Sequence, residues 1–463
     1  MSDVVKSTTK RDIASQLWNL AYPTMIAMAL QSFYDMVDMA WIGQYSQAAV
    51  SGVTIFSVLF QMFTILNEVA GASSVAMISQ SFGRNDIERT KIIAEQTITF
   101  KIVLAIISAV LLSIFIKPLI RFYTSDEQVI QHALDYGWLR IFFLPLAFSS
   151  YSVNTIFRCT DDTKTPMKIM IFSGFINFVL DPIFIFDNIN KLGFITLPFT
   201  IHGLGLGPFG AALATVISIT ISFLIGFVLL ISHRKAISIS IPGLLHLNKR
   251  VDFDLLRIGI PSGFNLFVRQ FFMTLMMKLI SQYGDVATAL SGVGAKISGL
   301  ALVPLFGFNM AGATIIGHHL GRNETDEAKR TAVIAACVCC ILASSITLII
   351  LAFPKSILSF FFTDPEVINE GVSMVRILAV SFVPLSFTVG LQTVFSGSGH
   401  TRPLLYSTIG STWLVQLPCL FIMVVVLHLP LVVVWFSYIL AELAHFIICV
   451  YHYKKGVWLV KRV

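Results

Sequence analysis

The chain has 463 residues, of which 56% are hydrophobic and 12% are charged, with a mean hydropathy of +0.81 and a formal net charge of +7. A soluble domain carries roughly 25% charged residues, so this composition excludes a water-exposed globular surface. The Lys and Arg residues are scattered over separate short loops, which excludes a nucleic-acid-binding patch. The composition predicts an all-α integral membrane protein that is embedded in a lipid bilayer.

Polar breaks divide the chain into apolar stretches, each long enough to cover the ~20 residues that a membrane-spanning helix needs. A membrane β-barrel would need short segments of alternating polarity, whereas these stretches are longer and apolar on all sides, which indicates transmembrane helices. The twelve predicted spans are residues 13–42, 49–81, 92–120, 129–157, 165–187, 208–232, 254–282, 287–317, 328–360, 367–396, 402–426 and 430–452.

The distribution of Lys and Arg predicts the orientation in the membrane. When both termini are placed in the cytoplasm, the inner loops and tails carry 22 of these residues and the outer loops carry 4. Cytoplasmic loops of membrane proteins are enriched in Lys and Arg. We therefore expect a multi-pass protein of the cell (inner) membrane with both termini in the cytoplasm.

The second half of the chain repeats the first half at an offset of 238 residues. Gly83-Arg84-Asn85 recurs as Gly321-Arg322-Asn323, and Pro23 matches Pro261. Each copy holds six predicted spans, an even number, so both copies enter the membrane in the same direction. The chain is therefore predicted to form two lobes that are parallel repeats, related by an axis along the membrane normal.

The repeat also predicts the domain organisation. We expect a six-helix lobe at residues 1–233, a cytoplasmic linker at 234–253 and a second six-helix lobe at 254–463. The outer loop at 188–207 has no counterpart in the second copy. Its sequence leaves open whether it dips into the membrane or caps the outside.

Acidic residues inside the spans are the strongest functional candidates. An acidic residue at the bilayer centre costs roughly 2.5–3.5 kcal/mol on insertion scales, so its presence there usually serves a function. Asp35 and Asp38 lie three residues apart in the first span and share a helix face. Asn177 and Asp181 share a face of the fifth span, and the following Pro182 frees a backbone carbonyl one turn earlier.

The second copy lacks these polar groups. At the offset of 238, the residues that match Asp38, Asn177 and Asp181 are Met276, Val415 and Cys419. A structural role common to both halves would predict polar residues in both copies, so we place the specialised site in the first half. For Glu68 and Glu442 we expect a structural role instead.

No enzyme motif is present in the sequence. There is no Walker A loop or dinucleotide-binding fingerprint, and the adjacent His318-His319 pair lacks the i, i+4 spacing of a zinc-protease helix. The six cysteines do not form the spaced set of a disulfide framework or a zinc site. We expect no enzymatic activity and no cofactor, so an ion gradient is the remaining energy source for uphill transport.

Taken together, these features resemble the multidrug and toxic compound extrusion (MATE) antiporters, and the DinF-like prokaryotic branch in particular. The resemblance rests on the two six-span repeats, the Gly-Arg-Asn loops, Tyr34-x-x-x-Asp38 and Asn177-Phe-Val-Leu-Asp181-Pro182, and it covers essentially the whole chain. It implies a V-shaped pair of lobes that alternate between inward and outward openings. Such proteins export amphipathic, often cationic, drugs or toxic compounds in exchange for H⁺ or Na⁺.

The resemblance also implies a cation-coupling site in the N-terminal lobe. Its residues come from the first, fourth, fifth and sixth spans and are Asp38, Tyr136, Asn154, Asn177, Asp181 and Thr215. Asp35 departs from the family pattern, so either first-span Asp is a candidate to carry the proton. Other branches have a Glu in the seventh span and an Asp in the tenth, and their absence here argues against a second cation site in the C-terminal lobe.

The coupling ion is H⁺ or Na⁺. Carboxyl groups in a dry interior exchange protons nearer physiological pH, and two of them a few ångströms apart titrate as a pair. The oxygen atoms of Asp38, Asn177, Asp181 and Thr215 would offer Na⁺ a cluster of hard ligands. Protons need only the acids, and we favour H⁺ for that reason.

A further set of residues is expected to line or gate the substrate cavity, namely Pro23, Gln31, Tyr34, Arg269 and Lys278. Pro23 would let the first helix bend. The basic residues bear on a rival function, a lipid-linked precursor flippase of the same superfamily, which would need a basic cavity for pyrophosphate. We expect small-molecule substrates and a monomeric protein.

Tags at residue 240, in the loop at Gly83 and in the loop at Gly321 should be accessible from the cytoplasm only, because the flanking Lys and Arg resist translocation. Labelling with a membrane-impermeant reagent, before and after permeabilisation of cells, measures this. Finding the Gly83 and Gly321 loops on opposite sides of the membrane would show that the repeats are inverted and would contradict the parallel arrangement.

Overall fold

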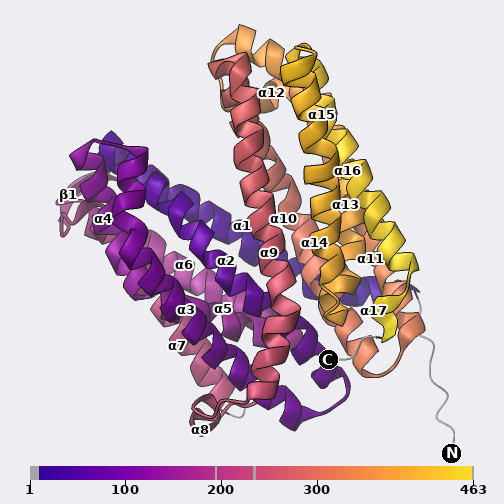
Figure 1. Cartoon of the computed structure of the whole chain (residues 1–463). Coiled ribbons are helices and arrows are strands. Elements are labelled where there is room, and N and C mark those ends of the chain that lie inside the picture. The colour runs from indigo at the N-terminus through magenta and orange to yellow at the C-terminus, as the bar shows by residue number, and fades with distance from the viewer. Residues whose placement is uncertain (1–9, 193–194, 233–235, 461–463) are drawn as a thin grey trace, which may run out of the picture. The chain divides into compact units, whose positions relative to one another are not determined.

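The computed structural model describes residues 10–192, 195–232 and 236–460, which are helical almost throughout (Figure 1). The elements are α1 (Lys10–Tyr45), α2 (Gln47–Gly83), α3 (Ile87–Tyr123), α4 (Glu127–Phe142), α5 (Leu144–Cys159), α6 (Lys164–Ile185), β1 (Asn188–Leu192), β2 (Ile195–His202), α7 (Gly207–Ile231), α8 (Ile241–Leu244), α9 (Lys249–Ile280), η1 (Ser281–Tyr283), α10 (Asp285–Gly321), α11 (Thr325–Ala352), α12 (Pro354–Leu358), α13 (Pro365–Ser398), α14 (Arg402–Thr408), η2 (Ile409–Gln416), α15 (Leu417–Phe421), η3 (Ile422–Val426), α16 (Leu431–Lys454) and α17 (Val457–Val460).

Each predicted span corresponds to one helix or to a run of consecutive helices, which confirms the prediction of a twelve-helix membrane protein with six helices in each half. By length and composition alone, nine helices of the described part of the chain are able to cross a membrane. The other spans differ for local reasons. α1 and α9 are more polar along their length, and the fourth span is divided into two helices of 16 residues each.

The fourth predicted span, residues 129–157, is not one continuous helix. Phe143 separates α4 from α5, and Pro145 follows two residues later. Proline has no N–H, and its ring clashes with the carbonyl group four residues earlier, so the helix cannot pass through this point unchanged. The prediction of a single helix is wrong here, and the break lies between Tyr136 and Asn154.

The eleventh span, residues 402–426, departs from α-helical geometry. Two π-helical stretches, η2 and η3, alternate with α14 and α15. Pro418 lies in α15, between them, and it removes one backbone donor from the helix. Single π-helical turns often mark functional sites. The apolar sequence of this span does not predict its π-helical backbone.

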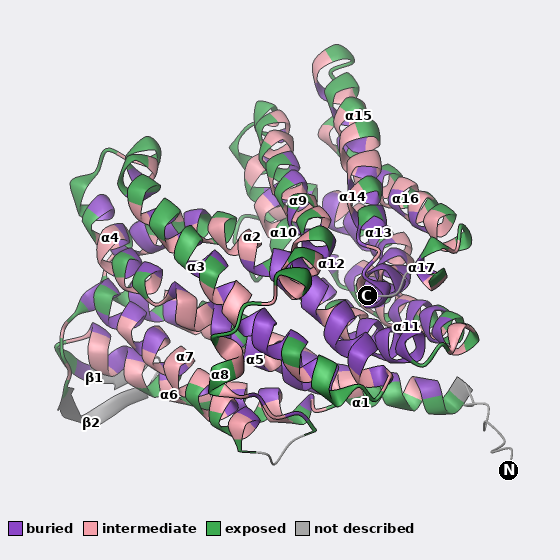
Figure 2. Cartoon of the chain, turned by 60° about the horizontal axis from the view of Figure 1, so that its bottom comes forward, coloured by how far each residue is buried: buried purple, intermediate pink, exposed green. Residues whose placement is uncertain are grey.

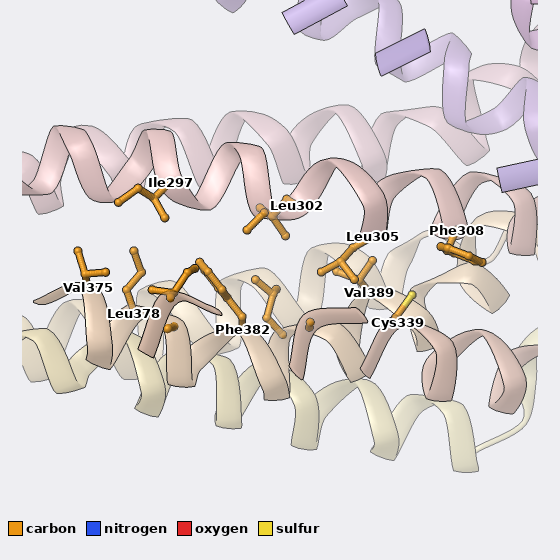
Figure 3. Close-up of a cluster of buried hydrophobic side chains, with 14 of the residues drawn as sticks. Ile297, Leu302, Leu305, Phe308, Cys339, Val375, Leu378, Phe382 and Val389 are labelled. Carbon is orange, nitrogen blue, oxygen red and sulfur yellow. The ribbon is translucent and has the colours of Figure 1, made fainter. Parts of the chain in front are cut away.

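Residues 10–25, 75–86 and 257–460 pack into one compact unit, here called the C-terminal unit. Its core lies where α10 faces α13 and α11, and the buried side chains there include Phe308, Cys339 and Phe382 (Figure 3). Small residues let the helices approach closely. A Cβ atom at Gly390 of α13 would lie 2.3 Å from the Cα atom of Ala336 on α11.

Residues 26–74 and 87–256 form the second compact unit, here called the N-terminal unit. Its core is built around Trp41 of α1, Phe56 of α2 and Tyr136 of α4, all of which are buried. Many apolar residues of α3 are exposed instead, as expected for a surface that faces lipid (Figure 2). They include Val103, Ile106, Ile107, Val110, Leu111 and Ile114.

The described part of the predicted linker, residues 236–253, is bound to α3 of the N-terminal unit, and residues 234–235 lie outside the described part of the chain. Glu95 accepts hydrogen bonds from the backbone N–H and the hydroxyl of Ser240, at 2.7 and 2.9 Å. The side-chain oxygen of Gln96 accepts a hydrogen bond from the Asn248 N–H at 3.0 Å. These contacts fix α8 and its flanking residues against one helix.

The compact units do not follow the predicted lobe boundary. The first part of α1 and the last part of α2 pack with the helices of the second copy. The lobes at residues 1–233 and 254–463 are defined by sequence repetition, whereas the units reflect side-chain packing. The division of the chain into these lobes therefore stays a prediction.

The outer loop at residues 188–207 contains a β-hairpin. Its two strands are antiparallel, with Asn188 paired to His202 and Leu192 paired to Ile195. The side chain of Asn188 also lies 2.9 Å from Nδ1 of His202. The paired strands satisfy backbone groups in a segment that has no equivalent in the second half.

Close helix packing in the C-terminal unit predicts a selective effect of added methyl groups. Gly390→Ala should lower the thermal unfolding temperature in detergent, because overpacking against backbone costs typically ~1–3 kcal/mol. Gly299→Ala on α10 is the matched control, since no atom lies within 4 Å of the added Cβ and alanine favours a helix by about 1 kcal/mol over glycine. Equal unfolding temperatures for the two variants would contradict the close packing of α11 and α13.

Candidate functional site

Two acidic residues from different helices come together inside the N-terminal unit. Asp38 of α1 is 9% exposed and Asp181 of α6 is fully buried. Their carboxyl groups lie within hydrogen-bonding reach of each other. The sequence predicted both residues as cation-coupling candidates, and the fold brings the two side chains together.

Neighbouring polar groups hold the two carboxyl groups in place. Asn177 lies one turn before Asp181 on α6 and donates a hydrogen bond from Nδ2 to Oδ1 of Asp181 at 3.2 Å. Thr215 of α7 lies 3.5 Å from Oδ2 of Asp38 and also donates to the carbonyl oxygen of Ala211 at 2.9 Å. Three helices, α1, α6 and α7, therefore meet at this pair.

Each carboxyl group keeps one buried oxygen without a hydrogen-bond donor among the described residues. These atoms are Oδ1 of Asp38 and Oδ2 of Asp181. Two ionised carboxylates offer only acceptors and repel each other, so a close pair needs a cation between or beside them. A single proton or a small metal cation would meet that need.

A half-buried arginine lies near the acids of α1. Arg140 of α4 donates a hydrogen bond from NH1 to the hydroxyl of Tyr136 at 2.6 Å, and its guanidinium lies 4.9 Å from the centre of the Phe60 ring. It interacts electrostatically with both Asp35 and Asp38. The sequence signal for Arg140 is a basic residue inside a predicted span, four residues after Tyr136.

Asp35 and Asp38 occupy different environments although they share a helix face. Asp35 is exposed, and its Oδ1 accepts a hydrogen bond from Nε2 of Gln31 at 3.0 Å. The charges of Asp35 and Asp38 influence each other. The structure thus pairs Asp38 with Asp181 across two helices, and it pairs Asp35 with Gln31 within α1.

Two further predicted residues, Tyr34 and Asn154, also belong to the N-terminal unit. Tyr34 packs on α6, where a Cβ atom at Gly174 would lie 1.8 Å from its ring, one turn before Asn177. Asn154 is half-buried on α5, beyond the break at Phe143. In the described structure its side chain makes no hydrogen bond to either acid of the pair.

The remaining predicted residues belong to the C-terminal unit, which is described by itself. Pro23 lies within α1, which continues through it as one helix. Arg269 and Lys278 lie on α9, where Arg269 is half-buried and Lys278 is exposed. Their predicted roles in the cavity or gate are not tested by these positions.

The donor set at the pair suits H⁺ or a hard cation. Within the part of the chain that the structure describes, no three His, Cys, Asp or Glu residues form a metal-binding group. The oxygens of Asp38, Asp181, Asn177 and Thr215 are the ligand type that Na⁺ prefers, and the unpartnered carboxylate oxygens are the first available to it. These four residues would hold a Na⁺ ion, which would supply positive charge only.

The MatE family model matches the chain twice, at residues 23–183 and 261–422. The two matches begin 238 residues apart and end 239 residues apart (261 minus 23, and 422 minus 183), which confirms the repeat seen in the sequence. Together they cover more than half of the chain. The protein therefore belongs to the MatE family, the multidrug and toxic compound extrusion transporters.

Individual relatives agree with this assignment. The chain is 26% identical over 463 residues to the probable multidrug resistance protein YoeA of Bacillus subtilis, covering 99% of this chain and 97% of that protein. It is 25% identical over 429 residues to the probable multidrug resistance protein NorM of Thermotoga maritima, covering 92% and 89%. Relatives of this kind are transporters, and the prediction that the protein is not an enzyme is confirmed.

Solved structures show the same fold. A MOP superfamily transporter from Pyrococcus furiosus matches with a TM-score of 0.87 and 21% sequence identity, covering 100% of both chains. At this identity the match supports the twelve-helix fold and not the chemistry of the site. The protein is thus a multi-pass membrane transporter with a buried carboxyl pair in one of its units.

Proposed function

We propose that the protein is a secondary active multidrug exporter that moves amphipathic, often cationic, compounds out of the cell in exchange for H⁺ by alternating access. Membership of the MatE family supports a transport role, and the relatives in Bacillus subtilis and Thermotoga maritima are named as probable multidrug resistance proteins. The pronounced apolar character of the chain suits amphipathic substrates. The protein acts in the cell membrane as a monomer, with both termini in the cytoplasm.

The observation that carries the proposal is the buried pair of Asp38 and Asp181. Each acid has one buried oxygen without a donor, and the two groups are within hydrogen-bonding reach. One proton placed between them supplies the missing donor and removes the repulsion between like charges. Sodium is the second coupling ion that this oxygen set would accept.

Protonation of the pair changes what holds α1 in place. With a proton, the contact between Asp38 and Asp181 ties α1 to α6, and Thr215 extends the contact to α7. Without it, repulsion between the acids favours a different position of α1, which Pro23 lets bend. A substrate and a proton that favour different positions of α1 exclude each other, and this negative coupling is the basis of antiport.

The flippase alternative gains no support from the N-terminal unit. A pyrophosphate site needs basic side chains that are free to bind it. Arg140 instead donates to Tyr136, stacks on Phe60 and faces the acids of α1. Arg269 and Lys278 are the remaining basic residues that the alternative would have to use.

Removing the charge of either buried acid should abolish gradient-driven export. Asp38→Asn and Asp181→Asn preserve side-chain size and hydrogen bonding, but an amide cannot bind and release a proton at physiological pH. Ethidium export from vesicles against its gradient, under an imposed pH or Na⁺ gradient, measures the effect. Lys278→Met is the control, and it should keep cation coupling although its substrate range can change.

Two outcomes would contradict the proposal. Asp38→Asn and Asp181→Asn proteins that reach normal membrane abundance and still export like the parent would exclude the pair as the coupling site. Export by the parent that ignores both the pH gradient and the Na⁺ gradient would exclude antiport altogether.

Asp35→Asn should cause a milder loss than Asp38→Asn. Asp35 is exposed and accepts a hydrogen bond from Gln31, whereas Asp38 is buried beside Asp181. Only Asp38 therefore shares a bound proton with a second acid. Export rates of the two variants at equal abundance, and their dependence on the pH gradient, measure the difference. Equal severity would instead assign both first-span acids to one shared proton site.

A further inference from the structure

The C-terminal unit buries a histidine beside a carboxyl group, and the proposed function uses neither. His445 lies on the buried stripe of α16 together with Ala441 and Cys449, and it is 9% exposed. Glu442 is half-buried one turn earlier on the same helix. Ionisable residues inside membrane-spanning helices are functional candidates, because their charged forms are costly there.

Three helices supply the partners of the His445 ring. Nδ1 lies 3.6 Å from Oε2 of Glu442, which is an ion-pair distance but too long for a hydrogen bond. Nε2 lies 3.2 Å from Nε2 of Gln392 on α13 and 3.2 Å from Oγ of Ser407 on α14. Both α13 and α14 pack on α16, so the ring joins three helices of the unit.

These partners suit both protonation states of the ring. When Nε2 is unprotonated, it accepts a hydrogen bond from the amide of Gln392. The Ser407 hydroxyl donates to the carbonyl oxygen of Leu404 at 3.0 Å, so its lone pairs are available to accept an N–H from a protonated ring. The carboxylate of Glu442 then faces the positive charge, and its Oε2 has no hydrogen-bond partner in the described part of the chain.

Few other groups bear on the charge of this ring. The titratable groups that face His445 in the described structure are Glu442 and the thiol of Cys449, both on α16. α13 and α14 present an amide and a hydroxyl, which do not change charge at physiological pH. A proton taken up here is therefore held by the ring and balanced by one carboxylate.

The position along α16 places the ring inside the membrane. His445 lies nine residues before Lys454, the last residue of the helix, which corresponds to about 14 Å at 1.5 Å per residue. Gln392 matches Asn154 of the first copy at the repeat offset of 238. The second copy thus keeps an amide at this position and adds a histidine and a carboxylate from its last span.

We propose that His445 and Glu442 form a second proton-binding site that is loaded and emptied during the export cycle. On loading, the lone pair of Nε2 binds one H⁺ from water, and Glu442 and Ser407 stabilise the resulting imidazolium. On release, the proton returns to water and Gln392 again donates to Nε2. The lack of a Glu in the seventh span and an Asp in the tenth, which other branches carry, argues against a second site in those spans, but this histidine lies in the twelfth span.

The first test measures protonation directly on the purified full-length protein by NMR of ¹⁵N-labelled histidine rings. The signal that disappears in His445→Gln identifies the residue. Its ring should change from the charged to the neutral form as the pH is raised through the range in which the protein stays folded. Glu442→Gln should move the midpoint by about one pH unit or more. A ring that stays in one charge state across this range would overturn the proposal.

His452→Gln is the matched control, because it makes the same substitution on the same helix outside the network. It should leave the His445 midpoint unchanged. Should His445→Gln fail to fold, Glu442→Gln alone still tests the site, because removal of the facing carboxylate must move the titration. An unmoved midpoint in Glu442→Gln would refute the pairing.

The second test uses transport, and it separates this inference from the proposed H⁺-driven export on which it rests. Ethidium export by vesicles should depend on pH in two steps in the parent. His445→Gln and Glu442→Gln should keep export but lose one step, whereas Asp38→Asn should lose export itself. Unchanged profiles in both variants would remove the second site and leave the antiporter intact. Continued export by Asp38→Asn would remove the proposed function regardless of His445.

Discussion

The contact between two buried carboxyl groups is the interaction on which the rest of the N-terminal unit depends. Asp38 and Asp181 come from the first and the fifth span, and their burial in an apolar unit is unfavourable unless a cation neutralises one of them. Asn177 and Thr215 fix the orientation of the two groups but cannot supply the missing charge. In the proposed mechanism, the relative position of α1, α6 and α7 is linked to whether a cation is bound.

Arg140 places a fixed positive charge near both acids of α1. Its guanidinium interacts with both acids of α1 while it donates to Tyr136 and lies over the Phe60 ring. This positive charge is permanent, because arginine stays protonated in proteins. In the proposed mechanism, the acid that exchanges its cation is the one that faces another carboxyl group, which is Asp38.

The two copies of the repeat have kept the helices and diverged in their charges. The first copy carries the carboxyl pair, and the matching positions of the second copy are Met276, Val415 and Cys419. The second copy instead carries a histidine and a glutamate on α16, supported by Gln392 and Ser407. Parallel repeats with different ionisable groups let two sites respond to one conformational cycle, which is what coupled transport requires.

The sequence by itself determined the membrane class, the twelve spans, the repeat at an offset of 238 and the acids Asp38 and Asp181. These follow from hydrophobic length and from the cost of charge in lipid, which act locally along the chain. Only the tertiary structure decided that Asp38 faces Asp181 and that Arg140 lies near the acids of α1, because such contacts join distant helices. It also decided the break at Phe143 and the partners of His445. The packing of neighbouring helices determines which side chains come into contact, and helix periodicity alone does not.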